Sequence, residues 1–404
     1  MISRLMPLDT KEEAMHSFNL NIQTELIFGK GRHLEIAKVI KRYNKKNVII
    51  LYGESFAVRS GLLETVTNLL DESEIEYVLY GGITPNPEVK HVREAKAIAK
   101  EYNVDLILAI GGGSVIDVAK SLSVNFYYDG DELDFSKRII KPKKALPLGV
   151  ILTHASAGSE MSASCVISDS SSNFKQGFRT DLIRPIFAIT NPELTYSVSM
   201  YQTAVGIVDT FMHSLERYFN KSDRIELADR FAEGIFITLR DCAEALIVDP
   251  YDEVARANLM LASTFSHNDI TSLGKKANLT AHTLEHAISA LYPKVAHGHG
   301  LAVIYPAWLF YYFDELKEKL DRFAKVVFHL HDKDIDTNAK NGILALKDLF
   351  IRLGLTTTLS SLGVKHEDIE TLADIVTDGG TSTLYHDQKS LTKDDIIKLY
   401  ESCF

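Results

Sequence analysis

Short apolar runs alternate with helical patterns up to about residue 198. Segments 60–70 and 88–102, and a segment that starts at Ser114, carry apolar residues at helical spacing. Before, between and after these segments lie five short runs rich in β-branched residues, NVIILY (47–52), EYVLYGGI (76–83), VDLILAI (104–110), ALPLGVIL (145–152) and PIFAI (185–189). This alternation predicts a mostly parallel sheet that is covered by helices on both faces.

After about Pro192 the pattern changes to long segments with a period of 3.6 residues, at 200–219, 224–248, 252–268, 271–291 and 300–314. Strand-like runs nearly disappear there. A length of 404 residues also favours two domains over one core. We therefore expect an α/β domain at residues 1–198, an all-helical domain at residues 199–404, and ligand sites in the cleft between them.

Composition removes several classes of function. The chain carries 44 basic and 54 acidic side chains, a net charge of −10, which argues against a nucleic-acid partner or an anionic membrane surface. No apolar run approaches the roughly 18 residues that span a bilayer, and the first residues do not resemble a signal peptide. The three cysteines are scattered, as in a reducing compartment, so we expect a cytoplasmic protein.

A glycine run lies where the third predicted strand turns into a helix, at Gly111, Gly112, Gly113 and Ser114. Glycines let the backbone approach a phosphate, and a helix start offers unpaired N–H groups and a positive dipole end. Crevices at the carboxyl ends of parallel strands are where α/β proteins bind nucleotides. The run is not GxGxxG, and a plain tight turn is the alternative interpretation.

Two further polar loops follow predicted strands. The loop LTHASAGSEMS (152–162) offers Thr153, Ser156 and Ser159 to a phosphate or ribose, unless it is a plain serine-rich surface loop. The loop LYGES (51–55) carries Glu54, which would accept from ribose hydroxyls and repel a 2′-phosphate. A solvated glutamate is the alternative for that position.

Asp209 and His213 lie four residues apart, on one face of a largely apolar predicted helix. His282 and His286 share another helix face, and His297 follows in a glycine-rich loop. One aspartate and up to three histidines suit Fe²⁺ or Zn²⁺. Surface ion pairing or hydrogen-bonded core histidines are the alternatives.

The stretch HTLEH (282–286) also fits the H-x-x-E-H pattern of zinc peptidases. A peptidase would leave the nucleotide-like loops of the first half without a role.

Taken together, the segments resemble the iron-dependent (group III) alcohol dehydrogenases, nearest to the butanol dehydrogenase and aldehyde reductase branch. The resemblance covers nearly the whole chain and is carried by PNP (85–87), GGGSVID (111–117), GSEM (158–161), GIVDTFMHSLERY (206–218), DRFAEGI (229–235), AHTLEHAISALY (281–292) and AHGHGLAVIYP (296–306). It implies a Rossmann-like dinucleotide-binding domain followed by an all-α metal-binding domain. It also implies hydride transfer between NAD(H) and a short-chain primary alcohol or aldehyde, in a homodimer.

The resemblance also implies roles for individual residues. Asp209, His213, His282 and His297 match the metal ligands, with Fe²⁺ expected and Zn²⁺ as the alternative, and His286 matches a proton relay beside the metal. The cofactor is expected to contact Gly53, Glu54, Ser55, Asn86, Gly111, Gly112, Gly113, Ser114, Asp117, Thr153, His154, Ser159, Lys175 and Leu194.

Three departures from the family pattern bear on these expectations. The loop YGES replaces a glycine-rich loop, so Glu54 favours NAD(H), with NADP(H) as the alternative. His154 and Ala157 are unusual in the second loop. The spacing from His282 to His297 is one residue longer than in the reductase branch, so His299 is an alternative to His297 as the last ligand.

Three other functions are alternatives to an alcohol dehydrogenase: a polyol dehydrogenase, a dehydroquinate-synthase-like lyase and a non-catalytic nucleotide-binding protein.

Overall fold

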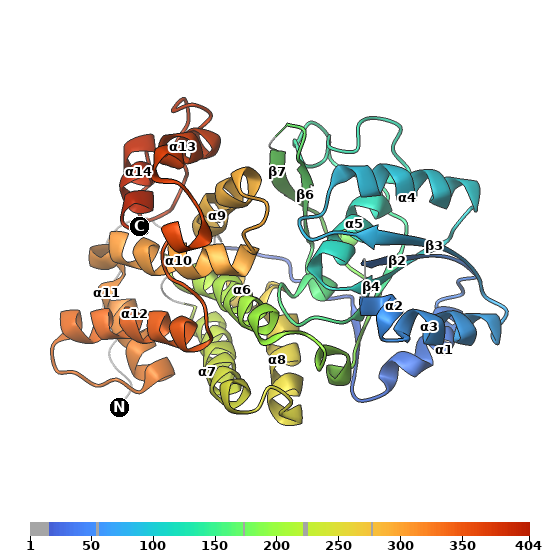
Figure 1. Cartoon of the computed structure of the whole chain (residues 1–404), viewed down its shortest axis with the longest axis horizontal. Coiled ribbons are helices and arrows are strands. Elements are labelled where there is room, and N and C mark those ends of the chain that lie inside the picture. The colour runs from blue at the N-terminus through green and yellow to red at the C-terminus, as the bar shows by residue number, and fades with distance from the viewer. Residues whose placement is uncertain (1–15, 54–55, 173, 221–224, 276–277) are drawn as a thin grey trace.

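The five predicted strands belong to one parallel sheet (Figure 1). The computed structural model describes residues 16–53, 56–172, 174–220, 225–275 and 278–404. The order in the sheet is β1-β8-β5-β4-β2-β3, and every pairing is parallel. The strands are β1 (Glu25–Phe28), β2 (Asn47–Gly53), β3 (Glu76–Ile83), β4 (Leu106–Gly111), β5 (Leu148–Leu152) and β8 (Phe187–Thr190). In the register of β4 and β5, Gly111 lies opposite Leu152, so the glycine run and the loop after β5 leave the same edge side by side.

Three strands of the structure are not predicted by the apolar pattern of the sequence. The edge strand β1 is only four residues long, which is too short for a period of two to stand out. Strands β6 (Ser164–Asp169) and β7 (Phe174–Arg179) form an antiparallel hairpin outside the main sheet. Strand β7, with the sequence FKQGFR, is half-buried and polar, so it carries no apolar run. This hairpin brings Lys175 to the cleft.

Helices cover both faces of the sheet (Figure 1). Helices α4 (Val89–Glu101) and α5 (Gly113–Asn125) pack on one face, against Ile49, Ile107 and their neighbours. Helices α1 (Ile36–Arg42), α2 (Phe56–Arg59) and α3 (Leu62–Asp71) pack on the other face, against Val48 and Leu106. Successive strand residues thus point to opposite apolar layers. The predicted α/β architecture is confirmed.

The second half is helical, as predicted. Its helices are α6 (Met200–Tyr218), α7 (Glu226–Val248), α8 (Glu253–Ser266), α9 (Thr280–Leu291), α10 (His297–Tyr311), α11 (Phe313–Phe328), α12 (Ile335–Arg352), α13 (Ile369–Thr377) and α14 (Lys393–Glu401). The predicted helix at 271–291 was wrong in its first part, because a single 3₁₀ turn, η5 (Ile270–Ser272), and Gly274 at φ 65° come before α9. Helix α10 begins at His297, a position predicted to be in a loop.

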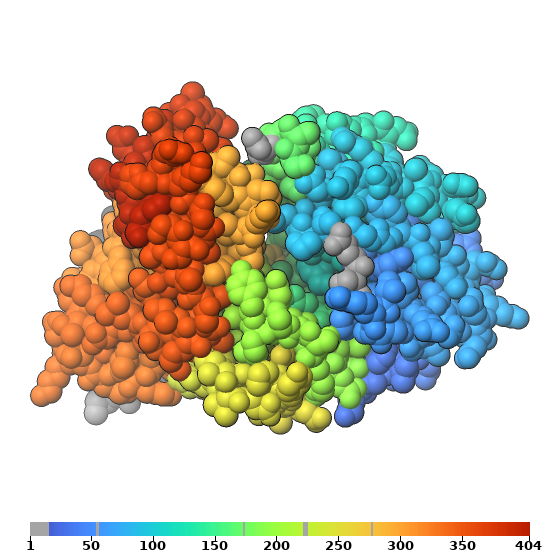
Figure 2. All heavy atoms as spheres, in the orientation of Figure 1, coloured from blue at the N-terminus to red at the C-terminus, as the bar shows by residue number. Residues whose placement is uncertain are grey.

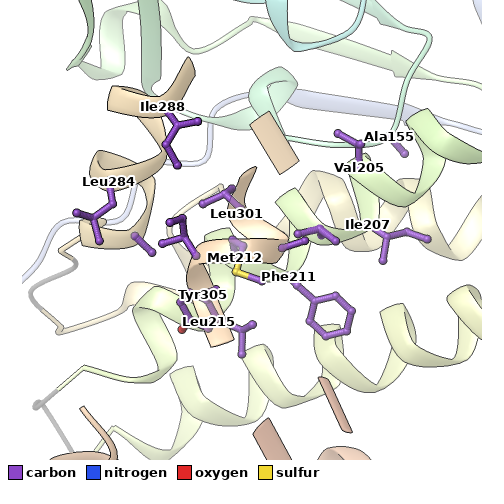
Figure 3. Close-up of a cluster of buried hydrophobic side chains, with 14 of the residues drawn as sticks. Ala155, Val205, Ile207, Phe211, Met212, Leu215, Leu284, Ile288, Leu301 and Tyr305 are labelled. Atoms are coloured by element: carbon purple, nitrogen blue, oxygen red, sulfur yellow. The ribbon is translucent and has the colours of Figure 1, made fainter. Parts of the chain in front are cut away.

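Helix α6 is the centre of the helical part, and all its residues from 203 to 218 are buried. Figure 3 shows Phe211, Met212 and Leu215 of α6 among side chains of α9 and α10. A helix that is buried all round is normally apolar all round. Asp209 and His213 are exceptions on this helix, and the free-energy cost of burying their polar groups has to be offset by interactions with other groups.

An ion cluster joins the two parts of the chain. Asp269, next to η5, pairs with Arg179 at the end of β7 and with Arg184 before β8. The side chain of Arg184 is only 1% exposed. Breaking a buried ion pair is costly, so this cluster fixes the hairpin against the helical part. Across the described residues, the structure has no helix that is both long and apolar enough to cross a membrane.

Candidate active site

A cavity of about 2000 Å³ lies between the α/β part and the helical part. Figure 2 shows the surface hollowed between the blue half and the orange and yellow-green half. The cavity is lined by the glycine run, the loop after β5, strand β7 and the facing sides of α6, α9 and the start of α10. All the predicted site residues that the structure describes border it, except Leu194. Glu54 and Ser55 lie outside the described residues.

The glycine run forms the turn from β4 into α5. Gly112 is the N-cap residue of α5, and Gly113 begins this 13-residue helix. A Cβ on Gly111 would lie 2.5 Å from the Val115 side chain, so only glycine fits there without a shift. The helix start faces the cavity through Gly113 and Ser114. Backbone N–H groups and the helix dipole make it suited to a pyrophosphate.

Asp117 and Ser159, both expected to contact the cofactor, are hydrogen-bonded to each other. Ser159 Oγ donates to Asp117 Oδ1 at 2.9 Å, and the Val166 backbone N–H donates to Oδ2 at 3.0 Å. Lys120 Nζ donates to Ser159 Oγ at 2.9 Å, and burial lowers the pKa of Lys120 to about 8. These side chains tie α5, the second loop and β6 together beneath the cavity.

The other predicted cofactor residues fall into two groups. Gly53, Thr153 and His154 line the cavity, and His154 Nε2 lies 3.1 Å from the Gln202 carbonyl oxygen. Leu194 instead packs partly buried against the apolar cluster under β1, β2 and α3, away from the cavity. Contact between Leu194 and the cofactor stays a prediction, and the position of Leu194 outside the cavity lining does not favour it.

Asn86 connects the two walls of the cavity. It has a left-handed backbone conformation, with φ 56°. Its Nδ2 donates to the Pro293 carbonyl oxygen at 3.0 Å, and its Oδ1 accepts from Lys175 Nζ at 3.1 Å. Burial lowers the pKa of Lys175. The α/β part thus places the amine of half-buried Lys175 near the imidazole of His286.

The predicted metal ligands converge. Asp209 Oδ1 lies 3.3 Å from His213 Nδ1, 3.8 Å from His282 Nε2 and 3.8 Å from His297 Nε2. Burial alone would raise the pKa of Asp209, but the imidazoles, led by His213, hold it well below its ordinary value. The ligand atoms of Asp209, His213 and His282 form one compact group, and His297 reaches it through Asp209 Oδ1. Together the four residues offer one carboxylate and three imidazoles, which suit Fe²⁺ or Zn²⁺.

The residues present fit such an ion. Asp209 Oδ1, His213 Nδ1 and His282 Nε2 are buried, and none has a hydrogen-bond partner among the described residues. Buried polar atoms without partners are costly, so the protein leaves these atoms open for a ligand.

Two buried carboxylates orient the histidines from behind. Glu216 accepts from His282 Nδ1, and Glu285 accepts from His297 Nδ1. In both rings the other nitrogen then faces Asp209. Such carboxylate–histidine pairs fix the ring orientation of metal ligands. Burial acts to lower the pKa of His282, but Glu216 and Asp209 raise it to about 9 in the metal-free protein.

The alternative ligand His299 is engaged elsewhere. Its Nδ1 lies 3.1 Å from the Tyr201 hydroxyl, and its Nε2 accepts from the Thr356 backbone N–H at 3.0 Å. Both nitrogens are therefore occupied. His297, at the start of α10, is the histidine that faces Asp209.

His286 borders the cavity one helical turn beyond His282. The centroid of its ring lies 5.2 Å from that of His297. Burial, together with the nearby Lys175 charge, lowers the pKa of His286 well below its ordinary value. His286 is therefore neutral near pH 7 and able to accept a proton.

The zinc-peptidase interpretation of HTLEH required Glu285 to act as a base at the site. Glu285 is fully buried and outside the cavity lining. Its Oε2 accepts from His297, and its Oε1 accepts from Ser289. It has no access to a substrate, so the peptidase interpretation fails.

Two residues have surroundings that the sequence did not suggest. Ser156, expected to bind phosphate or ribose, donates its hydroxyl to Asp209 Oδ2 at 3.0 Å. His267, at the end of α8, packs edge to face on His213 with ring centroids 4.1 Å apart. It lines the cavity and borders the ligand set without joining it. No spacing rule could find either residue, since each meets α6 only through the tertiary fold.

Comparison with known proteins identifies the family. Residues 23–192 match the iron-containing alcohol dehydrogenase family model, and residues 203–404 match the model of the C-terminal part of that family. The chain is 34% identical over 396 residues to NADH-dependent butanol dehydrogenase A of Clostridium acetobutylicum, covering 96% of this chain and 100% of the relative. It is 31% identical to NADPH-dependent aldehyde reductase YqhD of Escherichia coli, with 96% and 100% covered.

The solved structures agree with this. The crystal structure of NADH-dependent butanol dehydrogenase A from Thermotoga maritima superposes with a TM-score of 0.92 at 31% identity, covering 96% of this chain and 99% of that one. The family models together match well over half of the chain. The parallel sheet, the helical second half and the carboxylate–histidine cluster agree with these two family models. The chain therefore belongs to the iron-containing alcohol dehydrogenase family.

Proposed function

We propose that this protein is a metal-dependent alcohol dehydrogenase and aldehyde reductase that uses NADH in preference to NADPH and acts on short-chain primary alcohols and aldehydes. The observation that carries the proposal is the convergence of Asp209, His213, His282 and His297 in a cavity that also contains the glycine run. A polarising ion and a nicotinamide cofactor are the two components that such a reaction needs.

We assign the four converging residues as the metal ligands. Glu216 and Glu285 hold the rings of His282 and His297, so the metal-facing nitrogens need no reorganisation during the reaction. When bound, the nicotinamide would supply or take up the hydride, and an ion held by these four residues would supply Lewis acidity at the substrate oxygen. The protein contributes alignment of the reacting groups.

We assign His286 as the residue that moves the proton. Its low pKa leaves a neutral ring nitrogen to take the proton as an alcohol is oxidised and to return it as an aldehyde is reduced. The ammonium of Lys175, held by Asn86, lies close enough to contribute to that low pKa.

The cofactor side is assigned to residues 111–114 and to Gly53, Thr153 and His154, with Asn86 and Lys175 on the same α/β side of the cavity. The N-terminus of α5 supports a pyrophosphate at residues 111–114. The preference for NADH rests on the Glu54 carboxylate in the sequence, which would repel a 2′-phosphate. The relatives include both an NADH-dependent butanol dehydrogenase and an NADPH-dependent aldehyde reductase. The name of the butanol dehydrogenase also supports a short-chain alcohol as substrate.

The test is oxidation of NADH and of NADPH with butyraldehyde under anaerobic conditions. The chelated protein is compared with samples reloaded with Fe²⁺ or Zn²⁺. Metal-dependent turnover with a higher kcat/KM for NADH is the expected result. Preference for NADPH would retain the enzyme and overturn the argument from Glu54. Absence of turnover in a sample that has bound metal would overturn the proposed substrate class.

We also propose that residues 1–198 and 199–404 act as the cofactor and metal domains, that the protein is cytoplasmic and that it forms a homodimer. The dimer is supported by the open edge of β1 and by the exposed side chains of Phe18 and Leu20 before it. Light scattering coupled to size-exclusion chromatography gives the mass in solution. A monomer mass of 45.1 kDa would contradict the dimer.

A further inference from the structure

The two carboxylate oxygens of Asp209 have different surroundings. Oδ1 faces the three histidine nitrogens and accepts no hydrogen bond from the described residues. Oδ2 accepts a hydrogen bond from Ser156 Oγ at 3.0 Å. Asp209 itself is only 5% exposed. One oxygen is therefore anchored while the other is left for the ion.

Ser156 is itself held in place on helix α6. Thr210, the residue after Asp209, donates its hydroxyl to the Ser156 carbonyl oxygen at 2.6 Å. The loop lies directly against α6 because Gly206 has no side chain, and a Cβ there would lie 2.4 Å from the Ala155 carbonyl oxygen. Two contacts between the loop and the helix thus hold the backbone around Ser156 against α6.

The same loop also borders the glycine run. Thr153 donates its backbone N–H to the Gly111 carbonyl oxygen at 3.1 Å. A Cβ built on Gly112 would lie 3.2 Å from the His154 Cβ. Residues 153–156 therefore connect the candidate pyrophosphate site to the candidate metal ligand Asp209 through a short, packed piece of backbone.

We propose that Ser156 is a positioning residue that directs Asp209 Oδ1 toward the metal and links the cofactor loop to the metal site. This inference rests on the proposed function. A hydroxyl has a single proton, and Ser156 gives it to a carboxylate, so it has none left to donate to a phosphate. A hydrogen bond to a charged acceptor is roughly twice as strong as a neutral one, which suits a fixed orientation.

The test compares the wild type with Ser156→Ala, each stripped of metal and then titrated with Zn²⁺ in the presence of a competing chelator. Ser123→Ala is the matched control, because it removes a buried serine hydroxyl that donates to the Leu146 carbonyl, remote from the site. We expect the Zn²⁺ dissociation constant to rise about 10-fold or more in Ser156→Ala. The control should match the wild type.

A second readout separates positioning from general stability. The visible absorption bands of the Co²⁺-substituted protein report the coordination of the ion and should shift in Ser156→Ala. They should stay unchanged in Ser123→Ala, which also loses a buried hydrogen bond. Unchanged Zn²⁺ affinity and an unchanged Co²⁺ spectrum would overturn the role of Ser156. A wild type that binds neither ion would instead overturn the proposed function, and this inference with it.

Discussion

Glu216 on α6 contacts α9 through both of its carboxylate oxygens. Oε2 accepts from His282 Nδ1, and Oε1 accepts from the Ala281 backbone N–H at 2.6 Å. The helix that carries two of the candidate metal ligands thus also sets the ring of a third. A carboxylate with 0% side-chain exposure has no solvent to compete with these bonds.

Replacement of Glu216 by glutamine removes the charge and keeps the shape. We expect Glu216→Gln to lower Zn²⁺ affinity about 10- to 100-fold, because the amide no longer fixes the His282 ring. Chelator competition measures this. The control is Glu244→Gln, an exposed carboxylate that pairs with Arg352. Equal losses in the two variants would show that the orientation of His282 is not what matters.

His297 and His299 are to be separated by alanine variants. His297→Ala is expected to lose most of its bound metal and at least about 100-fold in metal-dependent kcat/KM. His299→Ala should keep its metal and lose about 1–3 kcal/mol of unfolding free energy, because hydrogen bonds to Tyr201 and Thr356 are lost. Elemental analysis and urea unfolding give the two quantities. Metal loss in His299→Ala alone would reverse the assignment.

His286 and His282 should differ in the same way. We expect His286→Ala to retain its metal and to lose about 10²- to 10⁴-fold in kcat, the usual range for removal of a proton-transfer group. His282→Ala should lose the ion itself. Metal content measured alongside turnover distinguishes the two effects. Equal metal loss in both variants would rule out a separate proton-moving role for His286.

The close contact at Gly206 predicts a difference between two glycines. Gly206→Ala places a Cβ 2.4 Å from a backbone carbonyl and should cost about 1–3 kcal/mol of unfolding free energy. Gly234, inside α7, has open space around its Cβ position, so Gly234→Ala should be stabilising by about 0.5–1 kcal/mol. Urea unfolding tests both. A tolerated Gly206→Ala would mean that the loop is free to move away from α6.

The pH dependence of the metal-free protein follows from His282. Its pKa is raised to about 9 in the folded state, from an ordinary value of 6.5. Its contribution to the unfolding free energy is therefore full below about pH 6.5 and is lost as the pH rises through about 9.

Between about pH 6 and pH 9.5, the chelated wild type should therefore lose up to roughly 3 kcal/mol relative to His282→Gln. Urea unfolding of both proteins at the two pH values provides the comparison. Parallel pH profiles would remove His282 as the source. The measured quantity is the difference in unfolding free energy between the two proteins, because contributions from the other histidines are present in both.

The sequence predicted those parts of the molecule that local pattern controls. Five strands and most helices follow from apolar periodicity, and the spacing of Asp209 and His213 follows from the helical repeat. Strand β1 is too short to show a period, and the polar hairpin β6–β7 shows none. Helix α9 begins late because Gly274 takes a left-handed conformation that periodicity does not report.

The candidate metal ligands could be predicted from the sequence, but the residues that orient them could not. Glu216 and Glu285 look like ordinary polar residues of helices, and only the packing of α6, α9 and α10 directs them at imidazoles. Ser156 was expected to face a phosphate, whereas the fold turns its hydroxyl to Asp209. Leu194 was expected at the cofactor only by resemblance, and its apolar side chain packs against an apolar cluster.

The two side-chain hydrogen bonds of Asn86 would respond differently to a widening of the cleft. Its bond to Lys175 lies within the α/β part, whereas its bond to the Pro293 carbonyl crosses to the helical part. If the cleft widens by rotation of the two parts as rigid bodies, the second bond breaks and the first survives. Lys175 then travels away with Asn86 while His286 stays behind on α9. A cleft that opened in this way would change the access route of the cofactor and the electrostatic environment of His286 together.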